Sequence, residues 1–324
     1  MRILAILVLI SVASAPAFSA PAPANDGKVT VKVKEPTKLE VYVNGEHFTT
    51  YNYSNEERKP YLWPLLAEGQ VGTTRDWPMD PDAKFPGQTD HVHHKSFWTA
   101  WGELNGVDCW GEEGDRAGWQ QTDKVTYGEE DGAAWIKAQN TWTDNNRKPV
   151  IAEEREYRFY PTPASARIFD VTVTFTAKYG DVLFGDTKEG GIVSYRMKPG
   201  MQMSGNGKGV MTLSTGETGK DVWGKPAAWC DYSAPVDDKG VRGIAVFDNP
   251  QNLRHPTRWH MRDYGLNGAN CFGLSYFTNK KENGDYTLKN GESLTFKYRV
   301  VIHSGTPEEA NIEKLYQEYA ASAK

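Results

Sequence analysis

The sequence predicts an all-β protein, built as a large antiparallel β-sandwich with a short C-terminal helix. Apolar and polar residues alternate with period two in four segments rich in β-branched and aromatic residues: 28–51, 166–180, 240–250 and 292–305. Asn44-Gly45 and Asn290-Gly291 each lie between two strand-like runs, which is a β-hairpin signature. The 31 Gly and 18 Pro residues punctuate the chain, and many strands over about 280 residues favour a single sandwich domain.

The N-terminal residues are predicted to lie outside this domain. Met1-Arg2, an apolar run over 3–13 and small residues around 15–19 are typical of a secretory signal peptide, so we expect residues 1–19 to be one. Residues 20–27 are expected to be a disordered Pro/Ala segment and residues 28–324 the single β-sandwich domain. A retained N-terminal anchor is the alternative, but the apolar run is shorter than the ~20 residues that cross a bilayer. The sequence therefore predicts a periplasmic or secreted protein.

The C-terminal segment is the one stretch with helical features. Thr306 is a candidate N-cap, Pro307 suits the first helical position, and Glu308 and Glu309 suit the first turn. We expect a short helix from this point towards the C-terminus.

Composition excludes some classes of function. The net charge is -5 and no basic stripe stands out, so nucleic acid is not an expected partner. Beyond the N-terminus no segment is apolar enough to span a membrane, and 11 Trp and 16 Tyr suit a globular protein with an aromatic-rich groove. The three cysteines, Cys109, Cys230 and Cys271, allow at most one disulfide, and the sequence leaves its pairing open. The sequence also leaves the oligomeric state open.

A histidine-rich segment, 89–110, is the first candidate site. If it is extended, His91 and His93 share one face and His94 points to the other. One hypothesis is a divalent metal held by His91, His93 and a distant His260, because imidazole binds Zn, Cu, Mn and Fe. The alternatives are a catalytic or sugar-contacting role without a metal, or histidines that only bond the backbone.

The strand that follows these histidines is predicted to lie in the middle of a sheet. Phe97, Thr99 and Trp101 fall on one face, and Trp98 and Ala100 on the other. Both faces carry bulk, which indicates a strand buried on both sides. The sequence therefore places the histidines above Trp98 or Trp101.

The turn 185–191 is the second candidate. It combines Asp186, Lys188 and Glu189 with Gly190 and Gly191, which would let a ligand approach the backbone. The sequence predicts a catalytic carboxylate here, and the alternative is a solvated turn with a surface ion pair.

The loop 255–273 is the third candidate. Arg258 and Arg262 could hold a carboxylate or sugar hydroxyls, and Trp259 could stack on a pyranose ring. The alternative is a structural loop shaped by its own Arg–Asp pair.

Several segments together carry a resemblance to a known family. The chain resembles a family of exported bacterial proteins labelled "methane oxygenase PmoA", and more recently a domain of unknown function, over roughly residues 51–305. The segments that carry it are KPYLWPL, TRDWP, DHVHHKSFWTAWGELNGVDCW, GDTKEGG, VWGKPAAWCDYSA, GIAVFDNPQNLRHPTRWHMRDYGL and GESLTFKYRVVIHSG. The monooxygenase subunit of that name is an integral membrane protein, so the resemblance favours a twisted sandwich similar to galactose mutarotase.

This resemblance also implies roles for particular residues. In mutarotase-like folds a histidine acts as general acid and a carboxylate as general base. The positions here that resemble this division are, for the acid, His93, His94 or His260, and for the base, Glu189 or Asp263. The implied substrate contacts are Arg75 in TRDWP, His91, Lys188, Arg258, Trp259 and Arg262.

The resulting expectation is a carbohydrate-active enzyme, a lyase, hydrolase or epimerase, that acts on a sugar or keto-sugar by histidine and carboxylate acid–base chemistry. Its partner would be a sugar or glycoside ligand. A noncatalytic carbohydrate-binding protein is the alternative, followed by a metal-dependent oxidase.

Overall fold

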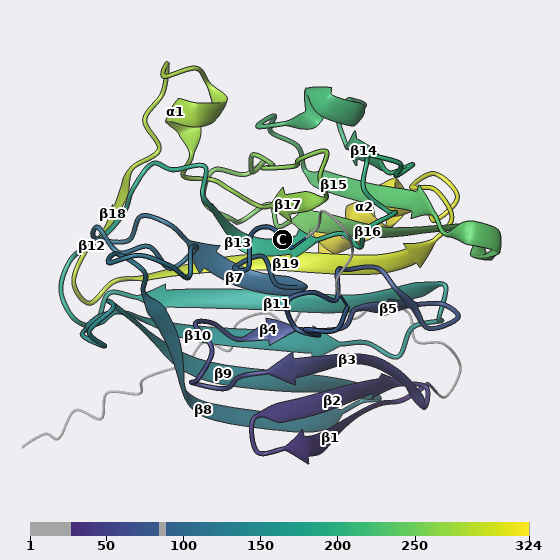
Figure 1. The fold of residues 1–324 in the computed structure, drawn as a ribbon, viewed down its shortest axis with the longest axis horizontal. Coiled ribbons are helices and arrows are strands. Elements are labelled where there is room, and N and C mark those ends of the chain that lie inside the picture. Colours follow the sequence, from purple (N-terminus) through teal and green to yellow (C-terminus); the bar gives the residue numbers. More distant parts are fainter. Residues whose placement is uncertain (1–26, 84–88, 324) are drawn as a thin grey trace, which may run out of the picture.

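The computed structural model describes residues 27–83 and 89–323 of the chain, and antiparallel strands dominate it (Figure 1). The predicted signal peptide, 1–19, and residues 20–26 of the predicted disordered segment lie outside the described residues. Within the described part, no helix is long and apolar enough to cross a membrane.

Two large antiparallel sheets form the sandwich. The seven-stranded sheet has the order β1 (Val29–Glu35), β2 (Lys38–Val43), β3 (Glu46–Asn52), β4 (Tyr61–Leu62), β7 (Phe97–Trp101), β13 (Gly190–Arg196) and β17 (Leu266–Gly268). The eight-stranded sheet has the order β14 (Val210–Leu213), β15 (Trp229–Pro235), β16 (Val241–Asp248), β19 (Ser293–Ser304), β11 (Ala166–Thr176), β10 (Pro149–Phe159), β9 (Ala133–Thr143) and β8 (Trp119–Glu130).

Smaller elements decorate the two sheets. Short antiparallel pairs join β5 (Leu66–Ala67) to β6 (Val71–Gly72), and β12 (Val182–Phe184) to β18 (Tyr286–Leu288). The helices are η1 (Gly219–Val222), η2 (Asp237–Lys239), α1 (Leu274–Phe277) and α2 (Ile312–Ser322). The predicted all-β antiparallel sandwich with a short C-terminal helix is therefore confirmed.

The two Asn-Gly signals have different outcomes. Asn44 and Gly45 both have positive φ, 54° and 84°, and connect β2 to β3 as a hairpin. Gly291 also has a positive φ of 86°, but β18 before it pairs with β12, whereas β19 after it pairs with β11 and β16. The second signal therefore marks a turn between two sheets and not a hairpin.

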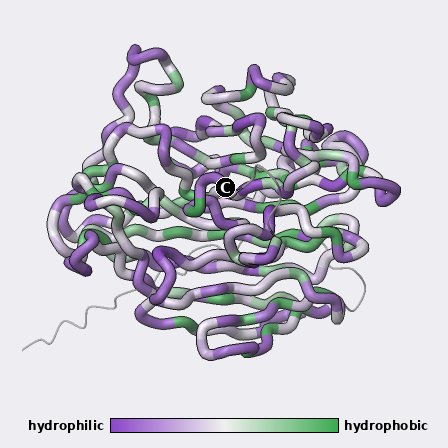
Figure 2. The backbone as a smooth tube through the Cα atoms, in the orientation of Figure 1, coloured by the Kyte–Doolittle hydropathy of each residue, from purple (hydrophilic) through white to green (hydrophobic). Residues whose placement is uncertain are grey.

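The main hydrophobic core lies between the two large sheets. Side chains such as Phe48 and Phe97 from one sheet meet Phe169 from the other with ring centroids 5.9 and 5.4 Å apart. Hydrophobic stretches follow the strands and hydrophilic residues concentrate in the connections (Figure 2). All three cysteines are buried and free, so the permitted disulfide does not form.

The C-terminal helix begins later than predicted. Thr306 and Glu309 bond reciprocally, with Glu309 N donating to Thr306 Oγ1 at 3.3 Å and Thr306 N donating to Glu309 Oε2 at 2.8 Å. This turn is interrupted by Asn311, whose φ is 54°, and α2 starts at Ile312. The helix then packs Ile312, Tyr316 and Tyr319 on the face of the eight-stranded sheet opposite the main core.

Strand β7 has the predicted central position. It lies between β4 and β13, and all five of its residues are buried. Phe97 and Trp101 belong to the main core, whereas Trp98 and Ala100 form a second cluster with Tyr61, Trp110 and Leu266 on the outer face of the seven-stranded sheet. This second cluster is the floor of the site described next.

Candidate functional site

The three clustered histidines lie on this floor in a turn and not in an extended segment. His91 has a φ of 50°, and its carbonyl accepts a hydrogen bond from His94 N at 2.9 Å. The turn stacks the His91 and His94 rings at 4.7 Å with an interplanar angle of 7°, and His94 in turn stacks on Trp98 at 5.5 Å. The prediction that His94 points away from His91 is therefore wrong, because it assumed an extended backbone.

Two buried arginines fix this turn. Arg75 Nε donates to the His94 carbonyl at 3.1 Å, and its other nitrogens donate to the carbonyls of Asp90 and His91. Arg196, at the end of β13, donates from Nη1 to His94 Nδ1 at 2.9 Å. His94 therefore carries its own proton on Nε2.

Both guanidinium groups share a single carboxylate. Asp90 Oδ1 lies 3.7 Å from Arg75 Nη1 and 3.5 Å from Arg196 Nη2. Burial would raise the pKa of Asp90, but Arg196, His91 and Arg75 together lower it. Burial and the neighbouring Arg196 lower the pKa of Arg75 to about 9, so this guanidinium is still charged at neutral pH.

The histidines of the turn are held neutral. Burial, followed by the charge of Lys59, lowers the pKa of His93 to about 3. Burial and the neighbouring His93 and Arg196 lower the pKa of His94 well below its usual value. The His93 ring contacts His94 and Trp110, and none of the described residues hydrogen-bonds to it. His93 is thus a neutral imidazole whose nitrogens are available to a ligand.

A buried lysine supports the turn from beneath. Lys59 Nζ donates to the carbonyls of Trp110 at 2.7 Å and His93 at 3.3 Å, and pairs with Glu112 at 3.2 Å. This side chain is 1% exposed. It joins the histidine turn to the loop that carries Trp110.

Tyr264 connects the histidine turn to the third candidate loop. Its ring stacks on His91 at 5.6 Å, and the guanidinium carbons of Arg196 and Arg262 lie 4.6 and 5.2 Å from its centroid. Burial raises the pKa of the Tyr264 hydroxyl, although both arginines oppose this. The loop 258–265 therefore borders the same surface as the histidines.

His260 is oriented by the turn that carries Lys188. Its Nδ1 lies 2.7 Å from the Lys188 carbonyl, which can only accept, so Nδ1 carries the proton and Nε2 holds a free lone pair. Nε2 is buried without a hydrogen-bond partner among the described residues. Burial lowers the pKa of His260 to about 4, against the opposing charge of Glu189.

Alternation along the chain explains which loop residues face the site. Trp259 is bridged to Ala269, and His260 N and Arg262 N donate to the carbonyls of Gly268 and Leu266, so the segment is extended. His260 and Arg262 therefore project to one side, whereas Trp259 and Met261 enter the main core.

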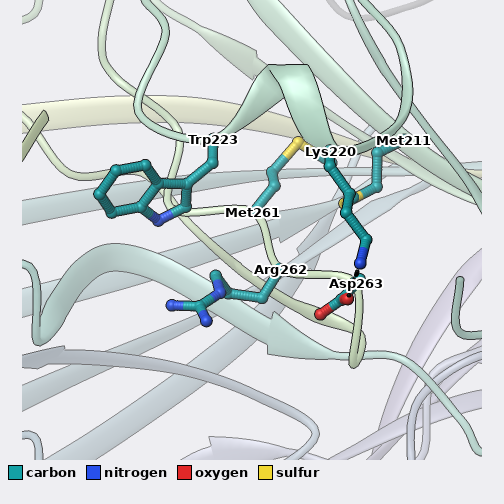
Figure 3. A pocket seen from close by; sticks show the side chains of 6 residues that line it. All are labelled: Met211, Lys220, Trp223, Met261, Arg262 and Asp263. Carbon is teal, nitrogen blue, oxygen red and sulfur yellow. Dashed lines mark ion pairs between the residues drawn. The ribbon is translucent and has the colours of Figure 1, made fainter. Parts of the chain in front are cut away.

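A pocket adjoins His260 at this edge. It has a volume of about 420 Å³ and is lined by Met211, Lys220, Trp223, Met261, Arg262 and Asp263 (Figure 3). The Trp223 ring lies 6.4 Å from the His260 ring. The outer-face site thus consists of Arg75, Asp90, the three histidines of the turn, Glu189, Arg196, His260, Arg262, Tyr264 and this pocket.

Several predicted site residues have structural partners instead. Trp259 is fully buried and its indole donates to the Ala227 carbonyl at 2.9 Å, so it presents no face to a sugar. Arg258 donates to the Gly224 carbonyl at 2.9 Å. Asp186 accepts bonds from the backbone of Ser275 and Gly284, which fixes the turn.

The remaining predicted residues border the site, and each of them forms an ion pair. Asp263 pairs with Lys220 at 2.9 Å on the wall of the pocket. Lys188 and Glu189 form an ion pair with each other, and both are partly exposed. Glu189 is the opposite charge that acts most strongly on His260, so its carboxylate belongs to the same site.

The hypothesis of a metal site finds no support in the arrangement. Among the described residues, no group of three or more His, Cys, Asp or Glu side chains could hold a metal ion. His91, His93 and His260 do not form such a group, because His91 and His93 contact each other while His260 contacts Trp223 and Phe277.

Sequence reasoning missed Arg196, Tyr264, Trp110 and Lys59. Arg196 follows the predicted turn by several strand positions, and only the pairing of β13 with β7 brings it to the histidines. Tyr264 lay inside the third loop, and period-two counting from His260 through Arg262 would have selected it.

Comparison with known proteins identifies a family. A sequence profile described as "Family of unknown function (DUF6807)" matches residues 38–317, so the chain belongs to this family. The match gives no support to the methane oxygenase label of the resemblance. No curated protein matches the sequence.

Solved structures give distant similarities. A polysaccharide lyase shares 13% identity and a TM-score of 0.40, with 92% of this chain and 35% of the lyase covered, so the chain spans about a third of its length. Galactose 1-epimerase from Lactobacillus acidophilus NCFM shares 7% identity and a TM-score of 0.37, covering 87% of this chain and 99% of the other. A galactose mutarotase related enzyme from Lactobacillus acidophilus shares 10% identity and a TM-score of 0.35, covering 86% and 98%. Such low scores assign neither an activity nor a ligand.

Proposed function

We propose that this member of the DUF6807 family is a carbohydrate-active enzyme that moves a proton on a sugar, as a lyase or an epimerase does, in the outer-face site. The observation that carries the proposal is a set of neutral imidazoles held beside fixed charges. Burial lowers the pKa values of His93 and His260 to about 3 and about 4, so both rings are neutral at neutral pH and each has an unprotonated nitrogen.

The hydrogen bonds suggest how the work is divided. His260 is a candidate base because its Nδ1 proton is committed to the Lys188 carbonyl and its unprotonated Nε2 has no hydrogen-bond partner among the described residues. His94 is a candidate acid because Arg196 donates to its Nδ1, which leaves the proton on Nε2. His93 can serve either role through its unpartnered nitrogens, and the Glu189 carboxylate stabilises positive charge that develops on His260.

Hydrolysis is less well supported than proton transfer. Most glycosidases use two carboxyl groups, one of which must be protonated to act as an acid. In the outer-face site Asp90 is shared by two arginines that lower its pKa, and Asp263 is paired with Lys220. Among the described residues of the site, Glu189 is the remaining carboxylate and it pairs with Lys188, so histidines supply most of the groups that can transfer a proton.

A sugar is the ligand that fits the lining of the site best. Tyr264 and Trp223 offer aromatic surface, and arginine, lysine and histidine side chains beside them offer hydrogen bonds. A polar ring with apolar C–H faces satisfies both kinds of surface. A noncatalytic sugar-binding protein would use the same lining, so the experiment must detect chemistry and not binding alone.

Solvent deuterium exchange tests the proposal directly. Sugars from a panel of aldoses, keto-sugars, uronates and oligosaccharides are incubated with the full mature chain in D2O and followed by NMR. We expect deuterium at one sugar carbon, or an elimination product, with wild-type protein and a loss of at least about a hundredfold in rate for His93→Gln and His260→Gln. Binding without exchange or product would favour the noncatalytic alternative and contradict the enzyme proposal.

Export is part of the same proposal and rests on the sequence of residues 1–19. N-terminal sequencing of the protein isolated from its native host should give a start near Ala20. An intact Met1 on cytoplasmic protein would contradict export.

A further inference from the structure

One cation in the outer-face site has no anionic partner among the described residues. Among the described residues, no ion pair or hydrogen bond reaches the guanidinium of Arg262, whose aliphatic and charged parts border Tyr264 and the pocket. The other cation of the pocket, Lys220, is paired with Asp263 at 2.9 Å. Figure 3 shows the Arg262 side chain extending beside Trp223, away from that ion pair.

The charges of the outer-face site and of the neighbouring Lys188 do not balance either. Four cations, Arg75, Arg196, Lys188 and Arg262, face two carboxylates, Asp90 and Glu189, which leaves a surplus of two positive charges. Lys220 and Asp263 cancel each other. The whole chain has a net charge of -5, so this local excess opposes the charge of the protein as a whole. A concave surface with fixed excess charge of one sign attracts a ligand of the other sign.

The buried groups next to Arg262 are also incompletely satisfied. Arg196, whose guanidinium also lies over the Tyr264 ring, is 2% exposed, and its Nε has no hydrogen-bond partner within the described part of the chain. A buried donor left without a partner costs free energy, which a bound acceptor or water recovers. Arg196 and Arg262 thus both lie over one aromatic ring, and both have hydrogen-bond donors without partners among the described residues.

The pocket walls fit a ring-shaped ligand. Trp223 is 36% exposed and stands beside Arg262 (Figure 3), where its indole can pack against the C–H face of a sugar. The volume of about 420 Å³ lies within the range of roughly 300–1,000 Å³ that is common for small-molecule sites. Met211 and Met261 supply an adaptable base.

We propose that the outer-face site selects an acidic sugar, whose carboxylate or sulfate group binds Arg262 while its ring packs on Trp223. The inference rests on the proposed function and names its class of substrate. The planar guanidinium can donate two parallel hydrogen bonds to either anion, which a neutral hydroxymethyl group cannot accept in the same way.

An acidic substrate would also bring His260 closer to its working range. Burial lowers the pKa of His260 most, Glu189 raises it, and the charges of Lys188 and then Arg262 lower it further. An anion bound to Arg262 offsets the effect of that cation and so raises the pKa of His260. Substrate binding at Arg262 would in this way make His260, the candidate base two residues earlier in the chain, more basic.

Calorimetric titration of the full mature chain tests the substrate class without requiring turnover. The probes are D-glucuronate, its methyl ester, D-glucose, D-glucose 6-sulfate and sodium sulfate. We expect at least one anionic sugar to bind about tenfold or more tightly than D-glucose and the neutral ester, with an advantage that shrinks as salt is added. The glucuronate and glucose 6-sulfate arms show which anion is preferred.

Variants locate the effect at the pocket. Arg262→Gln should remove the preference for the anionic sugar, whereas Arg262→Lys should retain part of it because the charge remains. Arg147→Gln is the matched control, because this arginine is exposed in the turn between β9 and β10 and lies over Trp119. Equal loss in the control would indicate a general effect of net charge and would overturn the assignment of Arg262.

The outcomes separate this inference from the proposed function. If neutral sugars exchange deuterium while anionic sugars show no preference, the acidic substrate class is wrong and the enzyme proposal stands. If sodium sulfate binds as tightly as every sugar anion, the pocket does not recognise a sugar ring and the inference is overturned. If no sugar binds or reacts, the proposed function fails and this inference fails with it.

Discussion

Two clusters on opposite outer faces of the sandwich contain buried charges. The two clusters differ in how far these charges have ion-pair and hydrogen-bond partners. In the helix-covered patch beneath α2, formed by Tyr160, Asp170, Arg299 and Tyr319, Arg299 donates to both oxygens of Asp170 at 2.7 and 2.9 Å. Tyr160 adds a third bond to the same carboxylate at 2.7 Å. The charges there are satisfied by each other and sealed by a helix.

The outer-face site is covered by loops and leaves groups unsatisfied. Arg196 Nε, His260 Nε2 and the indole nitrogens of Trp98 and Trp110 are buried without hydrogen-bond partners among the described residues. Incomplete satisfaction is not confined to this face, because the buried Asp231–His303 pair on the eight-stranded sheet also leaves one atom on each side chain unpartnered. The outer-face site differs from the helix-covered patch in its surplus of cations and in the pocket that adjoins it. A self-contained ion network stabilises the fold, whereas unbalanced groups beside a pocket indicate a ligand.

Glu189→Gln should give the largest effect on the functional side of this comparison. The change keeps the shape of the side chain and removes the charge that supports His260, so turnover should fall by about a hundredfold to ten-thousandfold. Stability should change by less than about 0.5 kcal/mol, because the pair with Lys188 is partly exposed. Deuterium exchange on the identified substrate and urea unfolding measure the two quantities. The matched control is Glu217→Gln, a partly exposed turn carboxylate paired with Lys225, and near-wild-type turnover by Glu189→Gln would contradict the assignment.

Asp170→Asn should give the largest effect on the structural side. It leaves the buried Arg299 without its counter-charge, which typically costs about 3–5 kcal/mol of unfolding free energy. Sugar binding by the folded variant should not change, because the patch lies under α2 on the other sheet. Urea unfolding at pH 7 checks this, with Glu318→Gln on the exposed side of α2 as the control. A loss below about 1 kcal/mol would mean that the network contributes little, as exposed pairs do.

The two clusters also differ in how far the sequence could predict them. The strands were predictable because alternation depends on local burial, and both β11 and β19 appear where the pattern placed them. Asn290-Gly291 was misread because a turn signal does not reveal which strand each arm will pair with. The start of α2 was predicted too early because Asn311 adopts a left-handed conformation, which the helix-start signals at Thr306 and Pro307 do not predict.

The sequence could predict which segments form the site, but it could not predict how their side chains lie relative to one another. The sequence identified the histidine turn, the 185–191 turn and the 255–273 loop, and the structure brings all three to one face through Tyr264 and the Lys188 carbonyl. Arg196 was missed because its role depends on the neighbouring strand and not on nearby residues. Trp259 was misassigned because an aromatic residue in this loop suggested a platform for a sugar ring. In the extended segment alternate side chains point to opposite sides, and Trp259 points into the core.

Lowering the pH should act on the outer-face site through His260. Its pKa is lowered from 6.5 to about 4 in the folded protein, so the unfolded chain binds the proton more readily between these values. The stabilisation from a neutral His260 is complete above pH 6.5 and is lost as the pH falls towards 4, by up to roughly 3 kcal/mol. Urea unfolding of wild type and His260→Gln from pH 7 to pH 4 should show a shallower slope in the variant. Parallel slopes would mean that His260 does not change its proton affinity on folding.

Thr306→Ala should give the smallest effect on stability. The change weakens the turn that leads into α2, so it should affect the helix-covered patch and leave the outer-face site unchanged. Thr306 Oγ1 accepts from Glu309 N, and the Glu309 carboxylate accepts from Thr306 N, so the pair closes the turn that leads into α2. Loss of such a cap costs about 1 kcal/mol. Asn311→Gly is the companion change, because glycine accepts the φ of 54° without strain and should leave stability nearly unchanged. Hydrogen exchange should become faster in α2 for Thr306→Ala, while sugar binding and the amides of the histidine turn stay as in wild type. If exchange also accelerated around His91–His94, the two faces would be coupled through the core, and the division into a structural cluster and a functional one would not hold.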